Sequence, residues 1–206
     1  IPVWHRSEML AWLVQDRRLF AVAGTHGKTT TSSMMTSVFQ RCNTDPVVFL
    51  GAEFDEIQGN AKDGQGIYAV IEADESDGSF LNYHPFASII TNIDEDHLDF
   101  YRDLDHIKEF FLKFLENHDK NGYSILCGDS PGVIQIRDQI SLIPLRTYFY
   151  GLNPENDFQI RNVQDVASET CFEVWKDDKR LAHLSIGVPG THNVLNATAV
   201  FCSAWI

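Results

Sequence analysis

The chain has 206 residues, a formal net charge of −13 and 44% hydrophobic residues. This length and apolar content suffice for a domain with a full hydrophobic core, and no apolar run is long enough to cross a membrane. The negative charge argues against a nucleic-acid partner. The cysteines form no C-x-x-C pair, so we expect buried thiols in a reducing cytoplasm rather than disulfides or a zinc site. These cysteines are Cys42, Cys127, Cys171 and Cys202.

The first residues predict a connecting segment. The chain opens with Ile1 rather than Met and carries no signal peptide, so we expect a piece of a longer soluble protein. Residues 7–17 predict a short amphipathic helix with Ser7 as its N-cap. Its apolar face would consist of Met9, Leu10, Trp12, Leu13 and Val14. Residues 1–18 are therefore expected to link a missing upstream domain to a domain formed by residues 19–206.

The stretch 20–31 predicts a strand, a tight glycine turn and the start of a helix. Residues 19–23 are apolar with a β-branched centre, as in a buried parallel strand. Gly24 and Gly27 allow the backbone to turn and to approach a ligand closely. A helix that begins after such a loop points free N–H groups and the positive end of its dipole at an anion.

Two side chains in this stretch indicate that the anion is a nucleotide phosphate with Mg²⁺. Lys28 would add a mobile positive charge for nucleotide phosphates, and Thr29 would place a hydroxyl where a P-loop binds Mg²⁺. The stretch is shorter than the general P-loop pattern, because Val22 stands where that pattern requires a glycine. The alternative is a glycine turn followed by a chance Lys-Thr pair. The strand before and the helix after favour a site for ATP or GTP phosphates.

The rest of the chain predicts an α/β fold, a mostly parallel sheet flanked by helices. Strands are expected at 46–51, 67–72, 87–93, 123–127 and 146–150, a loop at 55–66, and helices at 104–117 and from Pro131. Three further strands at 158–166, 170–176 and 180–186, without helices between them, predict a small antiparallel sheet attached to the main one. Asp177 and Asp178 would form a turn there. A last helix would begin near Gly190 and Thr191.

An acidic run follows the predicted strand 67–72. It contains Glu72, Asp74, Glu75 and Asp77. Such carboxylates repel one another unless water or a cation neutralises them, and a solvated acidic loop is the alternative. The run follows the carboxyl end of a parallel strand, the edge at which ligands bind in open α/β sheets. Glu72 is therefore a candidate to hold the Mg²⁺ of a nucleotide.

Two more polar groups are expected near the same edge. His97 follows the strand 87–93, between Asp96 and Asp99, which favours a two-cation site for phosphoryl transfer over an ordinary loop histidine. At the start of the last helix, Asn193 and Asn196 share a face. Their amides could read the edge of an adenine, or Thr191 or Asn193 could simply cap the helix.

Four stretches, 24–30, 72–77, 91–101 and 190–196, together resemble the central ATP-binding domain of the Mur ligases. The resemblance extends from Phe20 to the end of the chain and is strongest to the alanine-adding branch. It implies an ATP- and Mg²⁺-dependent cytoplasmic enzyme of peptidoglycan synthesis, which joins L-alanine to UDP-N-acetylmuramate through an acyl phosphate. It also implies a first domain for the UDP part and a third that closes over the site. We therefore expect the isolated piece to be inactive.

The resemblance further implies individual roles. Lys28, Glu72 and His97 would be catalytic. Thr29 and Glu72 would hold one Mg²⁺, and His97 would help to hold a second. The residues expected to bind ATP are Gly24, Thr25, His26, Gly27, Lys28, Thr29, Thr30, Asn92, His192, Asn193 and Asn196. Many Mur ligases carry a carbamylated lysine on the helix after the Asp-His motif. That position is Phe111 here, and the alanine-adding branch is similar in lacking the lysine.

Other readings stay open at this point. A ligase that recycles murein tripeptide belongs to the same family, and folylpolyglutamate synthetase is a more distant relation that fits the run 72–77 poorly. A nucleotide-dependent switch or hydrolase would carry an Asn-Lys-x-Asp-type guanine motif, which the sequence lacks. A non-catalytic P-loop module would have lost its lysine or its metal ligands, whereas Lys28, Thr29, Glu72 and His97 are all present.

Overall fold

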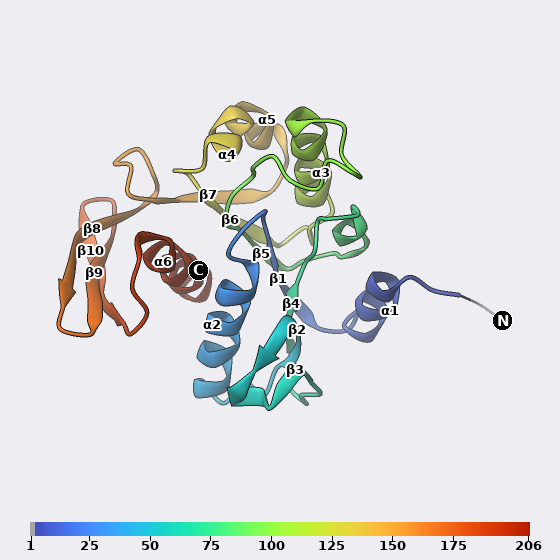
Figure 1. The fold of residues 1–206 in the computed structure, drawn as a ribbon, viewed down its shortest axis with the longest axis horizontal. Coiled ribbons are helices and arrows are strands. Elements are labelled where there is room, and N and C mark those ends of the chain that lie inside the picture. Colours follow the sequence, from blue (N-terminus) through green and yellow to red (C-terminus); the bar gives the residue numbers. More distant parts are fainter. Residues whose placement is uncertain (1–2) are drawn as a thin grey trace.

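A single sheet runs through the molecule in the order β10-β9-β8-β7-β6-β5-β1-β4-β2-β3 (Figure 1). The computed structural model describes residues 3–206. Its strands are β1 (Arg18–Ala23), β2 (Val47–Phe54), β3 (Gly59–Lys62), β4 (Tyr68–Glu72), β5 (Ala87–Ile90), β6 (Tyr123–Cys127), β7 (Arg146–Gly151), β8 (Phe158–Val166), β9 (Glu169–Lys176) and β10 (Lys179–Ile186). Its helices are α1 (Arg6–Leu13), α2 (Lys28–Arg41), α3 (Leu104–Glu116), α4 (Pro131–Gln135), α5 (Arg137–Leu142) and α6 (Thr191–Trp205), with 3₁₀ turns η1 (Asp55–Ile57) and η2 (Ser79–Asn82).

The centre of the sheet is parallel, as the sequence predicts. Strand β1 pairs in parallel with β4 and β5, and the parallel pairing continues through β6 and β7 to the start of β8. Strand β9 is antiparallel to both of its neighbours, β8 and β10. The expected fold class, with a small antiparallel part attached to the main sheet, is therefore confirmed. Asp177 and Asp178 both have positive φ angles, as a tight hairpin turn requires.

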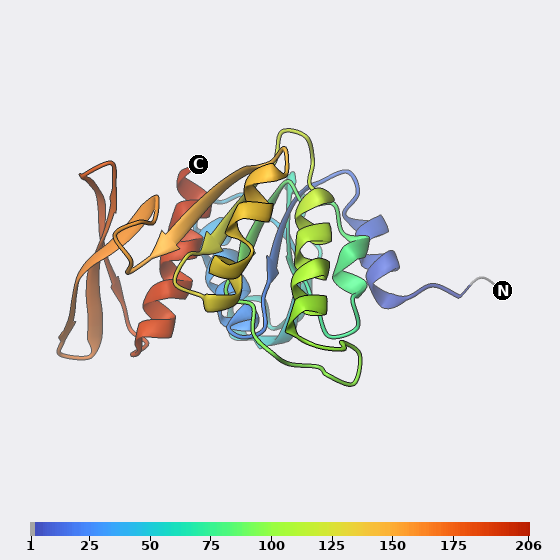
Figure 2. The ribbon, with the colours of Figure 1, turned by 90° about the horizontal axis from the view of Figure 1, so that it is seen from above.

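Helices cover both faces of this sheet, because the side chains of a strand alternate between its faces. In β1, Leu19 and Ala21 belong to one core cluster, whereas Phe20 and Val22 belong to the other. The first cluster includes residues of α3, α4 and α5, and the second includes residues of α2 and α6. In Figure 1, α3, α4 and α5 lie above the sheet and α2 and α6 below it. Figure 2 shows α3 and α5 side by side along one face.

The N-terminal helix differs from the prediction. It spans Arg6–Leu13 and its N-cap is His5, not Ser7. The His5 ring accepts a hydrogen bond from the Ser7 amide, and Glu8 accepts one from the His5 amide. The Ser7 hydroxyl instead accepts a bond of 2.8 Å from Asn82 in η2. The helix therefore begins earlier than expected and ends before residue 17. Residues 1–2 of the expected connector 1–18 lie outside the described residues.

The expected apolar face of this helix is largely exposed. Trp12 is 52% exposed, and Met9 and Leu13 are also on the surface. Only Val14 of the predicted set is buried in the core, with Leu10 packed partly against it. Periodicity identified a helix here, but it did not identify a core-facing surface.

The sequence did not predict the 3₁₀ turns η1 and η2, the strand β3 or the helix α5. The polar segment 55–66 was expected to be a loop, yet it contains η1 and the edge strand β3, which pairs antiparallel with β2. Edge strands with one solvated face need little apolar sequence. A second short helix, α5, follows α4 after a break at Ile136.

The four thiols were expected to be buried, and two of them are not. Cys127 and Cys202 are buried, but Cys42 is exposed and Cys171 is intermediate; all four are free thiols. Burial raises the pKa of the Cys127 thiol above its ordinary value. Among residues 3–206, no helix is both long enough and apolar enough to span a membrane.

Candidate nucleotide-phosphate site

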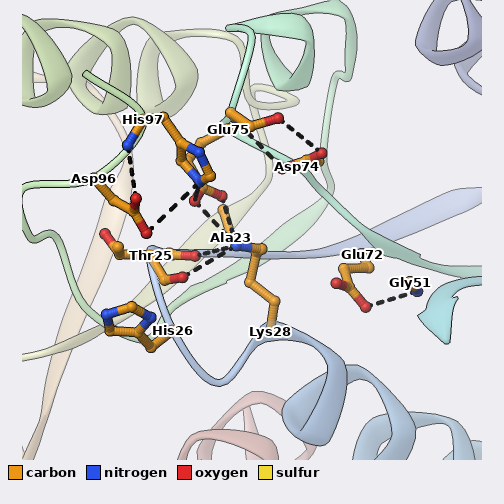
Figure 3. Close-up of polar contacts among 12 residues, drawn as sticks. Ala23, Thr25, His26, Lys28, Gly51, Glu72, Asp74, Glu75, Asp96 and His97 are labelled. Atoms are coloured by element: carbon orange, nitrogen blue, oxygen red, sulfur yellow. Dashed lines mark hydrogen bonds and ion pairs between the residues drawn. The ribbon is translucent and has the colours of Figure 1, made fainter. Parts of the chain in front are cut away.

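The carboxyl ends of three neighbouring strands converge on the glycine loop. Strand β1 lies between β4 and β5, and its register aligns Val22 with Glu72 and Ala23 with Ile90. The loop 24–27 follows β1, Glu72 ends β4, and Asn92 follows β5. Figure 3 shows the side chains of Lys28, Glu75 and His97 gathered at this edge. The expectation that Lys28, Glu72, Asn92 and His97 lie at the carboxyl ends of adjacent strands is confirmed.

The loop itself requires glycine. Gly24 has a φ of +131°, and a Cβ there would stand 2.2 Å from the Thr91 hydroxyl oxygen. Gly27 has a φ of +85° and serves as N-cap of α2. A side chain at Gly24 would therefore clash and strain the backbone. The loop that results ends directly at the N-terminus of α2, where unpaired amides and the helix dipole favour an anion.

Asn92 braces this loop. Its side-chain oxygen accepts a bond of 2.9 Å from the His26 amide, and its side-chain nitrogen donates a bond of 2.8 Å to the His26 carbonyl. The Thr91 hydroxyl also donates to that carbonyl at 2.6 Å. The Thr25 hydroxyl accepts from the Asp94 amide at 2.9 Å. Asn92 was predicted to bind ATP; in the structure its amide holds the loop in shape.

The Lys28 ammonium, predicted as a mobile charge, is held by three hydrogen bonds within the protein. It donates to the carbonyls of Gly24 and Thr25 at 2.8 and 3.3 Å, and to Glu75 Oε1 at 3.0 Å. The Lys28 side chain is 14% exposed and that of Glu75 is 2% exposed. Burial raises the pKa of the Glu75 carboxyl above its ordinary value, while the charge of Lys28 opposes that shift. The two groups form a buried ion pair.

Glu72 lies apart from this pair and bonds to a different part of the loop. Its Oε1 accepts a bond of 2.9 Å from the Thr29 hydroxyl. Its Oε2 accepts one of 2.8 Å from the Gly51 amide, which Figure 3 shows. The Ser32 hydroxyl lies 3.5 Å from the same Oε2. Thr29 and Glu72 were predicted to hold one Mg²⁺ together, and their side chains are in direct contact.

The acidic run does not form the cluster of mutually repelling carboxylates that its spacing suggested. Asp74 accepts from the amide and hydroxyl of Ser76, and Asp77 accepts from the Ser79 amide. Glu72 and Glu75 point to Thr29 and Lys28 respectively. Each carboxylate has its own donor, because the chain leaves the extended conformation after Glu72.

His97 approaches the ion pair from the loop after β5. Its Nε2 lies 3.6 Å from Glu75 Oε1 and 3.9 Å from Asp96 Oδ2, and its backbone has a φ of +53°. Positive φ is uncommon outside glycine, although histidine adopts it more often than most side chains do. The His97 amide donates to Asp96 at 2.7 Å, which holds the turn. His97 therefore lies at the predicted edge, facing two carboxylates.

The donor set suits Mg²⁺ in company with phosphates. Within residues 3–206, no three His, Cys, Asp or Glu side chains are arranged to hold a metal alone. Mg²⁺ normally keeps several waters and takes one or two protein oxygens together with substrate phosphates. The Thr29 hydroxyl and the Glu72 carboxylate, 2.9 Å apart beside the helix N-terminus, are oxygen donors of that kind.

A cavity of 320 Å³ opens beside the loop, between it and the start of α6. It is lined by His26, Gly27, Thr30, Thr91, Asn92, His192, Leu195 and Asn196. A Cβ on Gly27 would lie 3.0 Å from Asn196 Oδ1, so the last helix packs closely on the loop. Asn193 is different, because its side chain donates to the Pro189 carbonyl at 2.7 Å. The structure thus brings His192 and Asn196 to the loop and places Asn193 in a structural bond.

Three contributors were missed at the sequence level. Glu75, Tyr101 and Gly51 each touch the site, yet none was assigned a role. Gly51 has no local signal, because its contact with Glu72 arises only from the pairing of β2 with β4. Glu75 and Tyr101 lie in the stretches 72–77 and 91–101, but the sequence did not distinguish them from their neighbours as contributors to the site. Phe111, which the family resemblance aligns with a carbamylated lysine, is fully buried in the core.

A glycine loop between the first strand and a helix, with Lys-Thr at the helix start, is the arrangement of a P-loop nucleotide-binding domain. The chain belongs to the Mur ligase family, because residues 22–204 match the Mur ligase middle domain.

Curated relatives agree with this family. The chain is 44% identical over 199 residues to UDP-N-acetylmuramate–L-alanine ligase of Carboxydothermus hydrogenoformans, covering 97% of this chain and 42% of that protein. It is 45% identical over 204 residues to the ligase of the same name from Syntrophotalea carbinolica, covering 99% and 44%. The chain therefore spans less than half the length of the curated relatives that it matches.

Solved structures give the same fold. The UDP-N-acetylmuramate-alanine ligase MurC of Thermotoga maritima superposes with a TM-score of 0.81 at 30% identity, covering 95% of this chain and 42% of that one. MurF ligase of Thermotoga maritima, solved in complex with ADP, superposes with a TM-score of 0.76 at 19% identity over 98% of this chain and 49% of that one. At that lower identity the likeness concerns the fold alone.

Proposed function

We propose that residues 19–206 form the central ATP-binding domain of a UDP-N-acetylmuramate–L-alanine ligase, an enzyme of peptidoglycan precursor synthesis in the cytoplasm. Residues 1–18 would connect it to a first domain. The names of curated relatives at 44–45% identity support the substrates. The observation that carries the proposal is the Thr29–Glu72 contact of 2.9 Å beside Lys28, at the N-terminus of α2.

ATP would lie across the glycine loop. The amides at the start of α2 and the Lys28 ammonium would bind its phosphates, and the cavity lined by His26, His192 and Asn196 would take the adenine end. Thr29 and Glu72 would hold Mg²⁺, and His97 would help to hold a second cation. These cations would draw negative charge from the phosphates. A neighbouring fold of this type was solved with ADP.

The reaction would be amide synthesis through an acyl phosphate. A carboxylate oxygen of UDP-N-acetylmuramate attacks the γ-phosphorus of ATP, and the bond from phosphorus to the β-γ bridging oxygen breaks as ADP leaves. The L-alanine nitrogen then attacks the acyl carbon, loses a proton and displaces inorganic phosphate. In the first step two anions must approach each other. Lys28 and the α2 amides would reduce the repulsion between these anions by placing positive charge around the transferred phosphoryl group.

The buried position of the lysine suits this task. An ammonium held by two loop carbonyls keeps a fixed position, and fixed charges stabilise a transition state without reorganising. Asn92 contributes indirectly, because its two bonds to His26 hold the loop that carries the amides. The roles of Lys28, Glu72 and His97 as catalytic residues belong to this proposal.

The test is a substrate panel with the full-length protein. ADP formation is measured with UDP-N-acetylmuramate, ATP and Mg²⁺ and one amino acid at a time, and then with the tripeptide of recycled murein. We expect ADP only with UDP-N-acetylmuramate, and L-alanine as the preferred amino acid. A preference for the tripeptide would instead assign the recycling branch of the family. ADP release at the same rate without any acceptor would indicate an ATPase and contradict the proposal.

A further inference from the structure

Every N–H of the Lys28 ammonium already meets a protein oxygen. The carbonyls of Gly24 and Thr25 take two of them, at 2.8 and 3.3 Å, and Glu75 Oε1 takes the third at 3.0 Å. A lysine ammonium has three donors and no more. Lys28 can therefore bind a phosphate fully only by giving up one of these acceptors.

Glu75 is the acceptor that a phosphate would replace. The two carbonyls belong to the loop proposed to cradle the phosphates, whereas Glu75 comes from the segment that follows β4. Its Oε2 also lies 2.9 Å from Lys28 Nζ, yet this buried atom accepts no hydrogen bond within the described residues. The carboxylate thus offers Lys28 a negative charge and two oxygens at the distances that a phosphate would offer.

The backbone of Glu75 is anchored from behind. Its carbonyl accepts a hydrogen bond from the Tyr101 hydroxyl and another, of 2.9 Å, from the Gly78 amide. Tyr101 is 1% exposed, and its ring packs edge-on against Phe100 and Phe110. The Glu75 carboxylate is therefore delivered to Lys28 from a fixed backbone rather than from a loose loop.

From these contacts we propose that Glu75 is a positioning residue that holds Lys28 in place of the nucleotide phosphates and competes with them for the ammonium. This inference rests on the proposed ATP site. When ATP enters, the ammonium stays on the two loop carbonyls and exchanges Glu75 for the phosphates. When the phosphates leave, Glu75 binds the ammonium again. His97, whose Nε2 is 3.6 Å from Glu75 Oε1, stays beside the carboxylate while Lys28 is engaged elsewhere.

The direction of the effect distinguishes this role from a merely structural one. A carboxylate that occupies Lys28 and repels the incoming phosphates opposes nucleotide binding, so removing its charge strengthens that binding. A side chain that only supports the fold would weaken binding when replaced. AMP, which lacks the phosphates that a P-loop lysine reaches, should not respond to the change.

The experiment is calorimetric titration of the full-length protein with ATP and with AMP, in the presence of Mg²⁺. The variants are Glu75→Gln, which keeps the shape of the side chain but removes its charge, and Asp74→Asn as the matched control. Asp74 is the exposed neighbouring acid and bonds to Ser76 rather than to Lys28. Glu75→Gln should bind ATP roughly tenfold more tightly, while its AMP affinity and both affinities of Asp74→Asn stay at the wild-type value.

An ATP affinity that is unchanged or weaker in Glu75→Gln overturns the inference, as does an equal gain for AMP. If the wild type binds no ATP, the proposed function fails as well, so the two failures are distinguishable. Should Glu75→Gln not fold, as judged by circular dichroism, Glu75→Asp replaces it. The shorter side chain draws the charge back from Lys28, so ATP binding should still tighten, by about twofold to threefold. No gain in Glu75→Asp would also overturn the inference.

Discussion

Replacing Gly51 by alanine should displace the Glu72 carboxylate while every residue proposed to hold Mg²⁺ keeps its identity. A Cβ on Gly51 would lie 2.4 Å from Glu72 Oε1 and 2.8 Å from Oε2. These distances are too short for non-bonded atoms. The carboxylate is the end of a flexible side chain, and Gly51 does not have a positive φ, so the side chain of Glu72 rather than the strand is expected to move.

The expected magnitude follows from the bonds that Glu72 would lose. These are the 2.8 Å bond from the Gly51 amide and the 2.9 Å bond from the Thr29 hydroxyl. Because Glu72 is partly exposed, water replaces much of their energy, and we expect a loss of about 1–2 kcal/mol in the free energy of unfolding. Disturbing the partners of a metal ligand typically weakens metal affinity by about 10–100-fold. The Mg²⁺ concentration for half-maximal activity should rise by a factor in that range.

The assay is ADP release by the full-length enzyme over a Mg²⁺ titration, together with thermal unfolding. Gly59→Ala is the matched control, since an added Cβ on Gly59 in β3 meets no atom within 4 Å. It should leave both the Mg²⁺ dependence and the melting temperature at the wild-type values. A Gly51→Ala enzyme with an unchanged Mg²⁺ requirement would refute the assignment of Glu72.

Other outcomes can be checked separately. Lys28→Ala should reduce kcat/KM roughly a hundredfold or more. It should also lower the melting temperature, because it leaves the buried Glu75 carboxylate without its cation. An unchanged melting temperature would contradict the buried ion pair. Gly24→Ala should destabilise the domain, since its Cβ would stand 2.2 Å from Thr91 Oγ1 at a φ of +131°; an unchanged melting temperature would show that the loop can rearrange. Burial lowers the pKa of His118 to about 4, so the unfolded chain binds an extra proton between about pH 4 and 6.5. Stability should therefore fall with decreasing pH across that window, and His118→Gln should remove this part of the pH dependence measured in urea unfolding.

The parallel core was predictable because its strands are fully buried and read as continuous apolar runs. Residues 123–127 were predicted with the boundaries that the structure gives to β6, a fully buried strand of this core. Outside the core, residues 158–166 were predicted with the boundaries of β8, whose second half is exposed. The strand β3 was missed, because an edge strand of polar residues has no such signal. At the N-terminus, the apolar residues Met9, Trp12 and Leu13 do follow helical spacing but lie on the surface. Periodicity alone cannot tell whether a face has a partner within the chain.

The site was predictable where a motif determines local geometry. The loop glycines and the contact of Thr29 with Glu72 follow from placing motifs at neighbouring strand ends. The partner of Lys28 could not be predicted, because Glu75 reaches it only after the chain turns away from β4. Asn92 and Asn193 illustrate the same limit: both are polar and near the loop, yet both bond to backbone groups. Which oxygen an amide contacts is decided by tertiary packing.

The central claim is that a carboxylate attacks the γ-phosphate of ATP at this site. Its most direct test uses the full-length enzyme and UDP-N-acetylmuramate labelled with ¹⁸O in both carboxylate oxygens, with ATP, Mg²⁺ and L-alanine. Attack through an acyl phosphate leaves one labelled oxygen in the amide and transfers the other to inorganic phosphate. The account predicts that each phosphate molecule, analysed by mass spectrometry, carries one ¹⁸O atom. Unlabelled phosphate would mean that water attacks ATP instead and would contradict the account.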